Sequence, residues 1–139
     1  MIVPGLIAQA EFPGVPKSAA KARAFVRRAF ISRYGTSVED AVLLVSELVG
    51  NAVRHSDSGR LPDGTVRVTL SAPRADLVRV EVCDDGSAAD DLRPRLNADQ
   101  DSEGGRGLRL VDLLADKWGS HVQDHGRVVW FEMSVSATG

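Results

Sequence analysis

The sequence contains one cysteine, Cys83, among its 139 residues. A single cysteine excludes an intramolecular disulfide, and no Cys/His spacing typical of a structural zinc site is present. No apolar run approaches the roughly 18 residues that a membrane-spanning helix needs. The N-terminal stretch MIVPGLIAQAEFPG has no basic region and is interrupted by Pro4 and Gly5. We therefore expect neither a signal peptide nor a membrane segment, and a cytoplasmic protein is the default.

An excess of positive charge is also missing. The 17 Lys and Arg residues are outnumbered by 19 Asp and Glu residues, which gives a formal net charge of −2. No overall electrostatic attraction to nucleic acid is therefore expected. A hydrophobic fraction of 43% with 26% charged residues is ordinary for a soluble globular protein, and 139 residues suit one domain. We expect a single domain over residues 1–139.

Three segments have the apolar periodicity of helices. The first is PGVPKSAAKARAFVRRAFISRYG, with Ser18 as its expected N-cap. The second is expected to open at Thr36, three residues before Glu39 in the spacing of a capping box, and to run to about His55. The third is GGRGLRLVDLLADKWG, with Gly119 as its expected C′ residue.

Four segments alternate apolar and polar residues, as strands with one buried face do. GTVRVTLSA and DLVRVEVCDDG form one expected hairpin, and SHVQD and RVVWFEMSV form another. Hairpins rather than βαβ crossovers dominate, so the pattern predicts an α+β, two-layer fold. Its helices should cover one face of a largely antiparallel sheet.

A polar stripe interrupts the second expected helix. In SELVGNAVRHS, residues Glu47, Asn51 and His55 recur every fourth position, so they lie on one face, opposite the valines of the same helix. A solvated outer face is the ordinary explanation. However, Gly50 costs about 1 kcal/mol relative to Ala in a helix, and Leu43 and Leu44 fall on or near the polar side. Both observations favour a covered surface that meets a ligand.

Two further segments suggest ligand contacts. In VEVCDDG, Asp84 ends a strand and Gly86 would let a flat ligand approach the backbone; a plain hairpin turn is the alternative. In EGGRGLRLV, Gly104, Gly105 and Gly107 precede a helix, where free N–H groups favour phosphate; a hinge is the alternative. The segment from Ser87 to Glu103 has no periodicity, and a loop of that length is often a functional lid.

In this order, ELVGNAVRH, DDG and GGRGL resemble the N, G1 and G2 boxes of the GHKL (Bergerat-fold) ATP-binding superfamily. The start FPGVP, the segment LLVSELVGNAVRHS and the segment GGRGLRLVDLLADKWG are similar to its small stand-alone branch, the anti-sigma-factor serine/threonine kinases and related regulators. The resemblance covers nearly the whole chain. It implies a two-layer Bergerat fold, with a mixed sheet in which most strand pairs are antiparallel. It also implies ATP and Mg²⁺ as cofactors.

The resemblance implies a role for each matching residue. Asn51 would coordinate Mg²⁺, and Glu47 would be the general base that activates the attacking hydroxyl. Asp84 would accept a hydrogen bond from the adenine amino group, with Gly86 making room for the ring. The phosphates would be held by the segment Gly104, Gly105, Arg106, Gly107 and Leu108. The loop from Ser87 to Glu103 would be the ATP lid, with Arg93 and Arg95 as further phosphate contacts.

The implied function is a cytoplasmic kinase that transfers the ATP γ-phosphate to a Ser or Thr of a protein partner. In this branch the partner is an anti-sigma-factor antagonist, and a sigma factor can be sequestered as well. Direct contact with nucleic acid or membrane is not expected, and the sequence leaves a homodimer open. The role of His55 stays open between the site and helix capping.

A non-catalytic ATP-binding module that sequesters a protein partner is the alternative. Retention of Glu47 favours the kinase, because a purely binding site needs no base. Two departures from the superfamily pattern favour the module: Ala88 stands where a glycine is frequent, and Val128 and Val129 stand where relatives often have a Thr. A two-component histidine kinase is not expected, since 139 residues leave no helix pair that carries a phospho-accepting His.

Overall fold

The structure is a computed structural model that describes residues 5–86, 103–123 and 126–136, with only the backbone described at residues 36–37 and 103–108. Its sheet has five strands in the order β1-β2-β3-β5-β4, and every neighbouring pair is antiparallel. The strands are β1 Leu6–Pro13, β2 Thr65–Arg74, β3 Leu77–Asp84, β4 Lys117–Gln123 and β5 Gly126–Ser134. The predicted lid lies outside the described residues, apart from Glu103.

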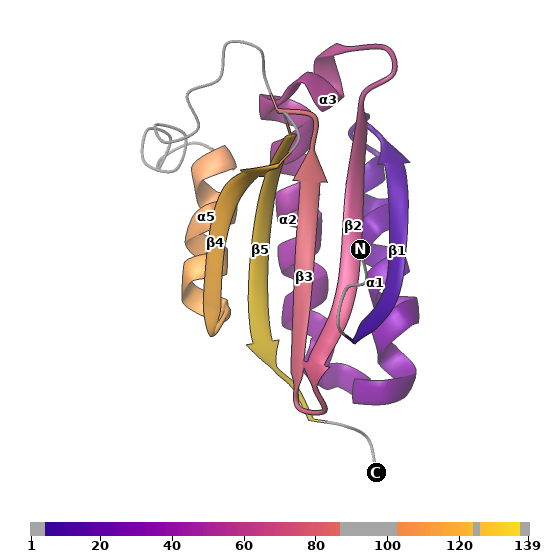
Figure 1. Ribbon diagram of the computed structural model, residues 1–139, viewed down its shortest axis with the longest axis vertical. Helices are drawn as coiled ribbons and strands as arrows, with labels where there is room; N and C mark the ends of the chain where they lie inside the picture. The colour runs from indigo at the N-terminus through magenta and orange to yellow at the C-terminus, as the bar shows by residue number, and fades with distance from the viewer. Residues whose placement is uncertain (1–4, 87–102, 124–125, 137–139) are drawn as a thin grey trace.

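Three long helices lie behind one face of this sheet (Figure 1). They are α1 Ser18–Tyr34, α2 Glu39–His55 and α5 Glu103–Leu114; a 3₁₀ turn, Gly35–Val38, precedes α2, and the single turn α3, Asp57–Arg60, follows it. Helix α2 packs against both α1 and α5 and against the centre of the sheet. The predicted α+β, two-layer class is therefore confirmed. Among the described residues, no helix is long and apolar enough to cross a membrane.

The core lies between the sheet and the helices because strand alternation sends one set of side chains there. Val78, Val80 and Val82 of β3 are buried, and their register partners on β5 are Met133, Phe131 and Val129. From the other layer, α2 contributes the valines that the sequence pattern assigned to its buried face. These are Val42, Val45 and Val49, each at most 1% exposed.

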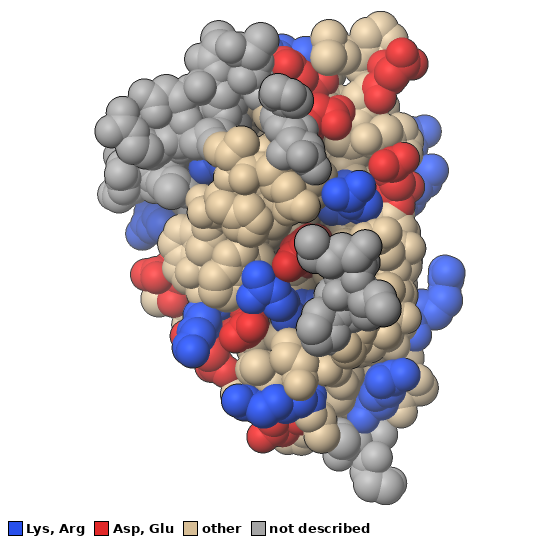
Figure 2. All heavy atoms as spheres, viewed as in Figure 1, with Lys and Arg blue, Asp and Glu red and all other residues tan. Residues whose placement is uncertain are grey.

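The opposite face of the sheet carries polar and charged side chains. Arg79 of β3 stacks on the ring of Trp130, with its Cζ atom 4.1 Å from the ring centroid. The same guanidinium donates hydrogen bonds to Glu81 and Glu132, each at 3.1 Å. In Figure 2, Lys and Arg are interspersed with Asp and Glu over this face. Charges of both signs therefore occupy the side of the sheet that the helices leave uncovered.

The predicted N-terminal caps of α1 and α2 were wrong. Lys17, not Ser18, is the N-cap of α1, and the Ser18 hydroxyl donates to the carbonyl of Pro13 at 2.6 Å. Helix α2 does not open at Thr36, because the chain first makes the 3₁₀ turn Gly35–Val38; its N-cap is Val38, which makes no side-chain cap hydrogen bond. Glu39 instead accepts hydrogen bonds from Arg27 of α1, at 3.0 and 3.2 Å.

The predicted end of the third helix was also wrong. Helix α5 ends at Leu114, and Gly119 lies inside β4 rather than at a C′ position. A Cβ atom on Gly119 would lie 3.0 Å from the ring of Trp130 on β5, so this glycine permits close packing of two strands. Asp116 helps to stop the helix, because its Oδ2 atom accepts hydrogen bonds from the backbone N–H and hydroxyl of Ser134.

One strand was missed. Residues Leu6–Pro13 form edge strand β1, which pairs with β2 and has an irregularity between Leu6 and Ala8. The segment does alternate, with Ala8, Ala10 and Phe12 opposite the buried residues of β2, and Gln9 on the other face bonded to Thr69. The sequence contains this alternation, but Pro4 and Gly5 directly before it are typical of turns, so no strand was predicted.

Candidate functional site

The polar stripe of α2 is half-buried. Glu47, Asn51 and His55 are each partly covered. Of the two leucines expected on or near the polar side, Leu44 is fully buried but Leu43 is 38% exposed, so the expected cover is only partial. Helix α2 contacts both α1 and α5, and its accessible positions include Leu43 and Arg54, which are exposed, beside the half-buried stripe. The stripe is therefore not the fully solvated outer face of a surface helix.

Gly50 leaves space for an arginine of the same helix. A Cβ atom at Gly50 would lie 3.3 Å from Nη1 of Arg54. The other terminal nitrogen of this guanidinium, Nη2, donates a hydrogen bond to Oδ1 of Asn51 at 2.8 Å. The sequence interpretation placed a ligand beside Gly50 but did not consider Arg54. In this structure the space is taken by a positive charge that contacts Asn51.

The turn after β3 has the predicted geometry. Asp84 ends the strand and is 9% exposed, and its Oδ1 atom accepts a hydrogen bond from the N–H of Gly86 at 2.7 Å. Gly86 has a φ of 67°, in the left-handed region that glycine adopts without strain. Its carbonyl accepts from the N–H of Asp57 at 2.6 Å, so the turn is attached to the start of α3.

Asp85 stabilises this turn. Its N–H donates to the hydroxyl of Ser58, and its Oδ2 atom accepts from the N–H of Thr65, both at 2.9 Å. The Ser58 hydroxyl in turn donates to the carbonyl of Thr65 at 2.6 Å. These bonds join α3, β2 and the turn, so the second aspartate of the DDG motif has a structural role. Sequence reasoning missed the contribution of Ser58, because the contact joins segments 27 residues apart.

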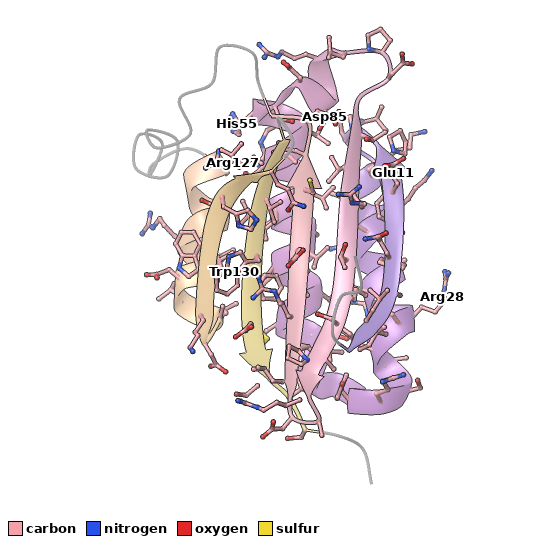
Figure 3. All side chains as sticks on the ribbon, in the orientation of Figure 1. Glu11, Arg28, His55, Asp85, Arg127 and Trp130 are labelled. Carbon is pink, nitrogen blue, oxygen red and sulfur yellow. The ribbon has the colours of Figure 1, made fainter. Side chains whose placement is uncertain are left out.

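The end of α2 and the end of β3 lie at the same end of the molecule. Figure 3 shows His55, Asp85 and Arg127 together there, on α2, on the turn after β3 and on β5. The start of α5 lies at this end as well (Figure 1). The fold therefore brings together the three sequence segments that were expected to meet one ligand.

The glycine segment differs from expectation. Gly104, Gly105 and Gly107 were expected in a loop before the third helix, but all three lie within α5, which begins at Glu103. Glycine disfavours a helix by only about 1 kcal/mol relative to Ala, so the neighbouring turns can draw these residues into it. The side chains of Arg106 and Leu108 are outside the described part of the chain.

Sequence reasoning did not consider Arg127, which lies across the strand pair from Asp84. Arg127 is 5% exposed and is the register partner of Asp84 across β3 and β5, so the two side chains point to the same, helix-covered face. On this strand the sequence analysis considered only Val128 and Val129, which stand where relatives often have a Thr. Counting back in twos along β5 from the apolar Phe131 would have identified Arg127 as facing inward.

Cys83 has the orientation that alternation predicts. It pairs with Val128 on the uncovered face, whereas Asp84 pairs with Arg127 on the other. Burial raises the pKa of the Cys83 thiol, with smaller opposing and reinforcing effects from neighbouring charges. The thiol therefore lies on the face of the sheet opposite to Asp84, and its raised pKa disfavours the nucleophilic thiolate.

The donors near Asn51 fit magnesium only if a ligand supplies further oxygens. Within the described residues, no group of three or more His, Cys, Asp or Glu side chains could hold a metal ion. Mg²⁺ is commonly bound through one or two protein oxygens together with phosphate oxygens and water. The amide oxygen of Asn51 suits that mode, once it is released from Arg54.

A protein-family model matches most of the chain. The model of the histidine kinase-like ATPase domain matches residues 12–133, from β1 into β5. This range includes Glu47, Asn51, Asp84 and the glycines of α5. No curated protein matches the chain. The match covers most of the sequence and agrees with the antiparallel sheet covered by helices on one face. The chain belongs to the histidine kinase-like ATPase domain family.

Proposed function

We propose that this ATP-binding domain is a kinase-like regulator that transfers the γ-phosphate of Mg·ATP to a Ser or Thr of a protein partner. The family supports ATP as the ligand and a kinase-like use of it. The observation that carries the finer proposal is the position of Glu47. It lies one helical turn before Asn51 on the same half-buried strip of α2.

The chemistry requires a base beside the phosphates. Glu47 would take the proton of the partner's hydroxyl while that oxygen forms a bond to the γ-phosphorus. The bond from the γ-phosphorus to the β–γ bridging oxygen would break, and ADP would leave with the electron pair. When bound, Mg²⁺ neutralises charge on the phosphates. Positioning and charge neutralisation carry most of the catalysis in such transfers.

The adenine ring of ATP would be bound at the end of β3. The carboxylate of Asp84 is buried, and the N–H of Gly86 donates a hydrogen bond to its Oδ1 atom. This bond holds the carboxylate in one orientation, which also sets the position of Oδ2. A carboxylate accepts hydrogen bonds and donates none when ionised, so it selects a base that presents an amino group. Adenine has that group, which agrees with ATP as the ligand.

The proposed partner is an anti-sigma-factor antagonist, with a sigma factor as a second partner, acting in the cytoplasm. This part of the proposal rests on the resemblance of the FPGVP, SELVGNAVRHS and GGRGLRLVDLLADKWG segments to that branch. A binding module that uses ATP only to shape a partner surface is the second candidate. The contact from Arg54 to Asn51 favours it, because a positive charge already occupies the oxygen expected to bind the metal.

The test is transfer from γ-labelled ATP to proteins captured by the chain. The parent should label a captured partner, and Glu47→Gln should bind Mg·ATP equally while its transfer rate falls about 10²- to 10⁴-fold. Glu39→Gln is the matched control, since Glu39 lies on the same helix but is paired with Arg27 at the surface. Equal rates for Glu47→Gln and the parent would contradict the role of Glu47. A parent that binds ATP and partner without transfer would support the module.

A further inference from the structure

A buried arginine, Arg127, lies across the strand pair from Asp84, the carboxylate that is proposed to bind adenine. Arg127 is 5% exposed and Asp84 is 9% exposed. Burying a guanidinium away from water is costly unless an opposite charge and hydrogen-bond acceptors compensate it. The side chain directly across the strand pair from Arg127 is Asp84. Side chains opposite each other in an antiparallel pair have Cβ atoms about 4.5–5.5 Å apart, so the side chains of Asp84 and Arg127 leave the backbone next to each other on the same face.

The backbone fixes both side chains at this point. A Cβ atom on Gly126 would lie 2.4 Å from the carbonyl oxygen of Asp84, so only glycine allows β5 to begin so close to the end of β3. Arg127 follows Gly126 immediately, so the start of the strand sets the position from which its side chain leaves the backbone. On the other side, the N–H of Gly86 holds Oδ1 of Asp84. The two charged groups are thus presented in a fixed order.

An apolar surface adjoins the pair. The next inward-facing residues on the two strands are Val82 and Val129, which are register partners of each other. Val82 is 3% exposed and Val129 is half-buried. An acceptor and a donor at the edge of an apolar surface match a flat heterocycle whose edge carries one donor and one acceptor side by side.

We propose that Arg127 is a specificity-determining residue of the base site. It would donate a hydrogen bond to the ring nitrogen N1 of adenine, next to the amino group that donates to Asp84. The inference rests on the proposed function, in which Asp84 binds the base. Adenine presents a donor followed by an acceptor on this edge, whereas hypoxanthine and guanine present an acceptor followed by a donor. A fixed carboxylate–guanidinium pair therefore selects adenine more strongly than a carboxylate does alone.

The alternative is that Arg127 serves only as a structural partner of Asp84. Both roles predict that Arg127→Met destabilises the fold, because it leaves a buried carboxylate without its neighbouring charge. They differ in how the substitution affects ligands that lack N1. A structural role would weaken the binding of all adenine nucleotides by the same factor, whereas a direct contact would weaken only those that carry the nitrogen.

The experiment is calorimetric titration of ATP and 1-deaza-ATP, in which a C–H replaces N1. The parent should bind ATP roughly tenfold more tightly than 1-deaza-ATP, as expected for the loss of one hydrogen bond to a charged donor. Arg127→Met should bind the two ligands with equal affinity, and Arg127→Lys, which keeps a charged donor, should retain part of the preference. Circular dichroism and thermal unfolding establish that each variant is folded.

Three outcomes would overturn the inference. A parent with equal affinity for ATP and 1-deaza-ATP shows that N1 is not contacted, and this arm holds even if Arg127→Met does not fold. A folded Arg127→Met that keeps the full preference assigns the contact to another group. A parent that binds neither nucleotide sinks the proposed ATP site together with the inference. Either of the first two outcomes, in a parent that binds ATP, overturns the inference and leaves the proposed ATP site standing.

Discussion

The guanidinium of Arg54 holds the side-chain oxygen of Asn51, with Nη2 and Oδ1 2.8 Å apart on successive turns of α2. This oxygen is the proposed metal ligand, so a bound Mg²⁺ has to replace Arg54 there. A guanidinium released from Asn51 would remain beside the phosphates, and Gly50 provides the space in which it lies. Sequence reasoning had not considered Arg54, which the structure places in contact with the proposed metal ligand.

Arg54→Met should weaken the binding of ADP about three- to tenfold at low ionic strength, because it removes a positive charge next to the phosphates. The loss should shrink at high salt, which screens exposed charges. Arg28→Met is the matched control: it removes the same charge from the exposed face of α1, on a different part of the molecule (Figure 3). Equal losses in the two variants would attribute the effect to net charge, and contradict a local role for Arg54.

Asp116 should make stability depend on pH in acid. The hydroxyl and backbone N–H of Ser134 donate to its carboxylate and hold the pKa of Asp116 below its usual value of 3.8. A lowered pKa in the folded state stabilises the fold above the unfolded pKa, and this contribution is lost as the pH falls through the folded pKa. Asp116→Asn should therefore lower the Tm by up to about 4 °C at pH 6. The difference should shrink as the pH falls below 3.8 toward the lowered pKa of the folded state, as measured by thermal unfolding; a constant difference from pH 6 downward would exclude the charged form as its cause.

Cys83 should react slowly with iodoacetamide at pH 8. Burial raises the pKa of its thiol, and only the thiolate is nucleophilic, so alkylation should be at least several-fold faster in 6 M urea. Saturating ATP should leave the rate in the folded protein unchanged, because Cys83 faces the side of the sheet opposite Asp84. Protection by nucleotide, followed by mass spectrometry, would contradict this placement of the ligand.

Much of the fold could be predicted from periodicity. The valines of α2 and the alternation of β2, β3 and β5 follow directly from one-sided burial, and the structure confirms them. Helix ends were less predictable, because they depend on contacts between distant segments. Glu39 pairs with Arg27 of another helix rather than capping its own, and Asp116 is held by Ser134, 18 residues away.

The parts of the candidate site that lie within one short motif could be predicted from the sequence. The parts that come together only through strand pairing were missed. Asp84 and Gly86 form their hydrogen bond within three residues, so the DDG motif contains the turn. Arg127 becomes a neighbour of Asp84 only through the register of β3 with β5, which no local pattern specifies. Arg54 was within the motif, but its residue type alone does not say that it contacts Asn51.

The most direct test of the account is titration of Mg·ATP into the parent and into Asn51→Ala. Alanine favours a helix more than Asn does, so α2 should remain intact while the proposed metal ligand is lost. Ser46→Ala is the control, since the Ser46 hydroxyl only donates to the carbonyl of Leu43 on the same helix. We expect the parent and Ser46→Ala to bind with equal affinity and Asn51→Ala to bind at least tenfold more weakly. Equal affinity of Asn51→Ala and the parent, or a parent that does not bind Mg·ATP, would contradict the account.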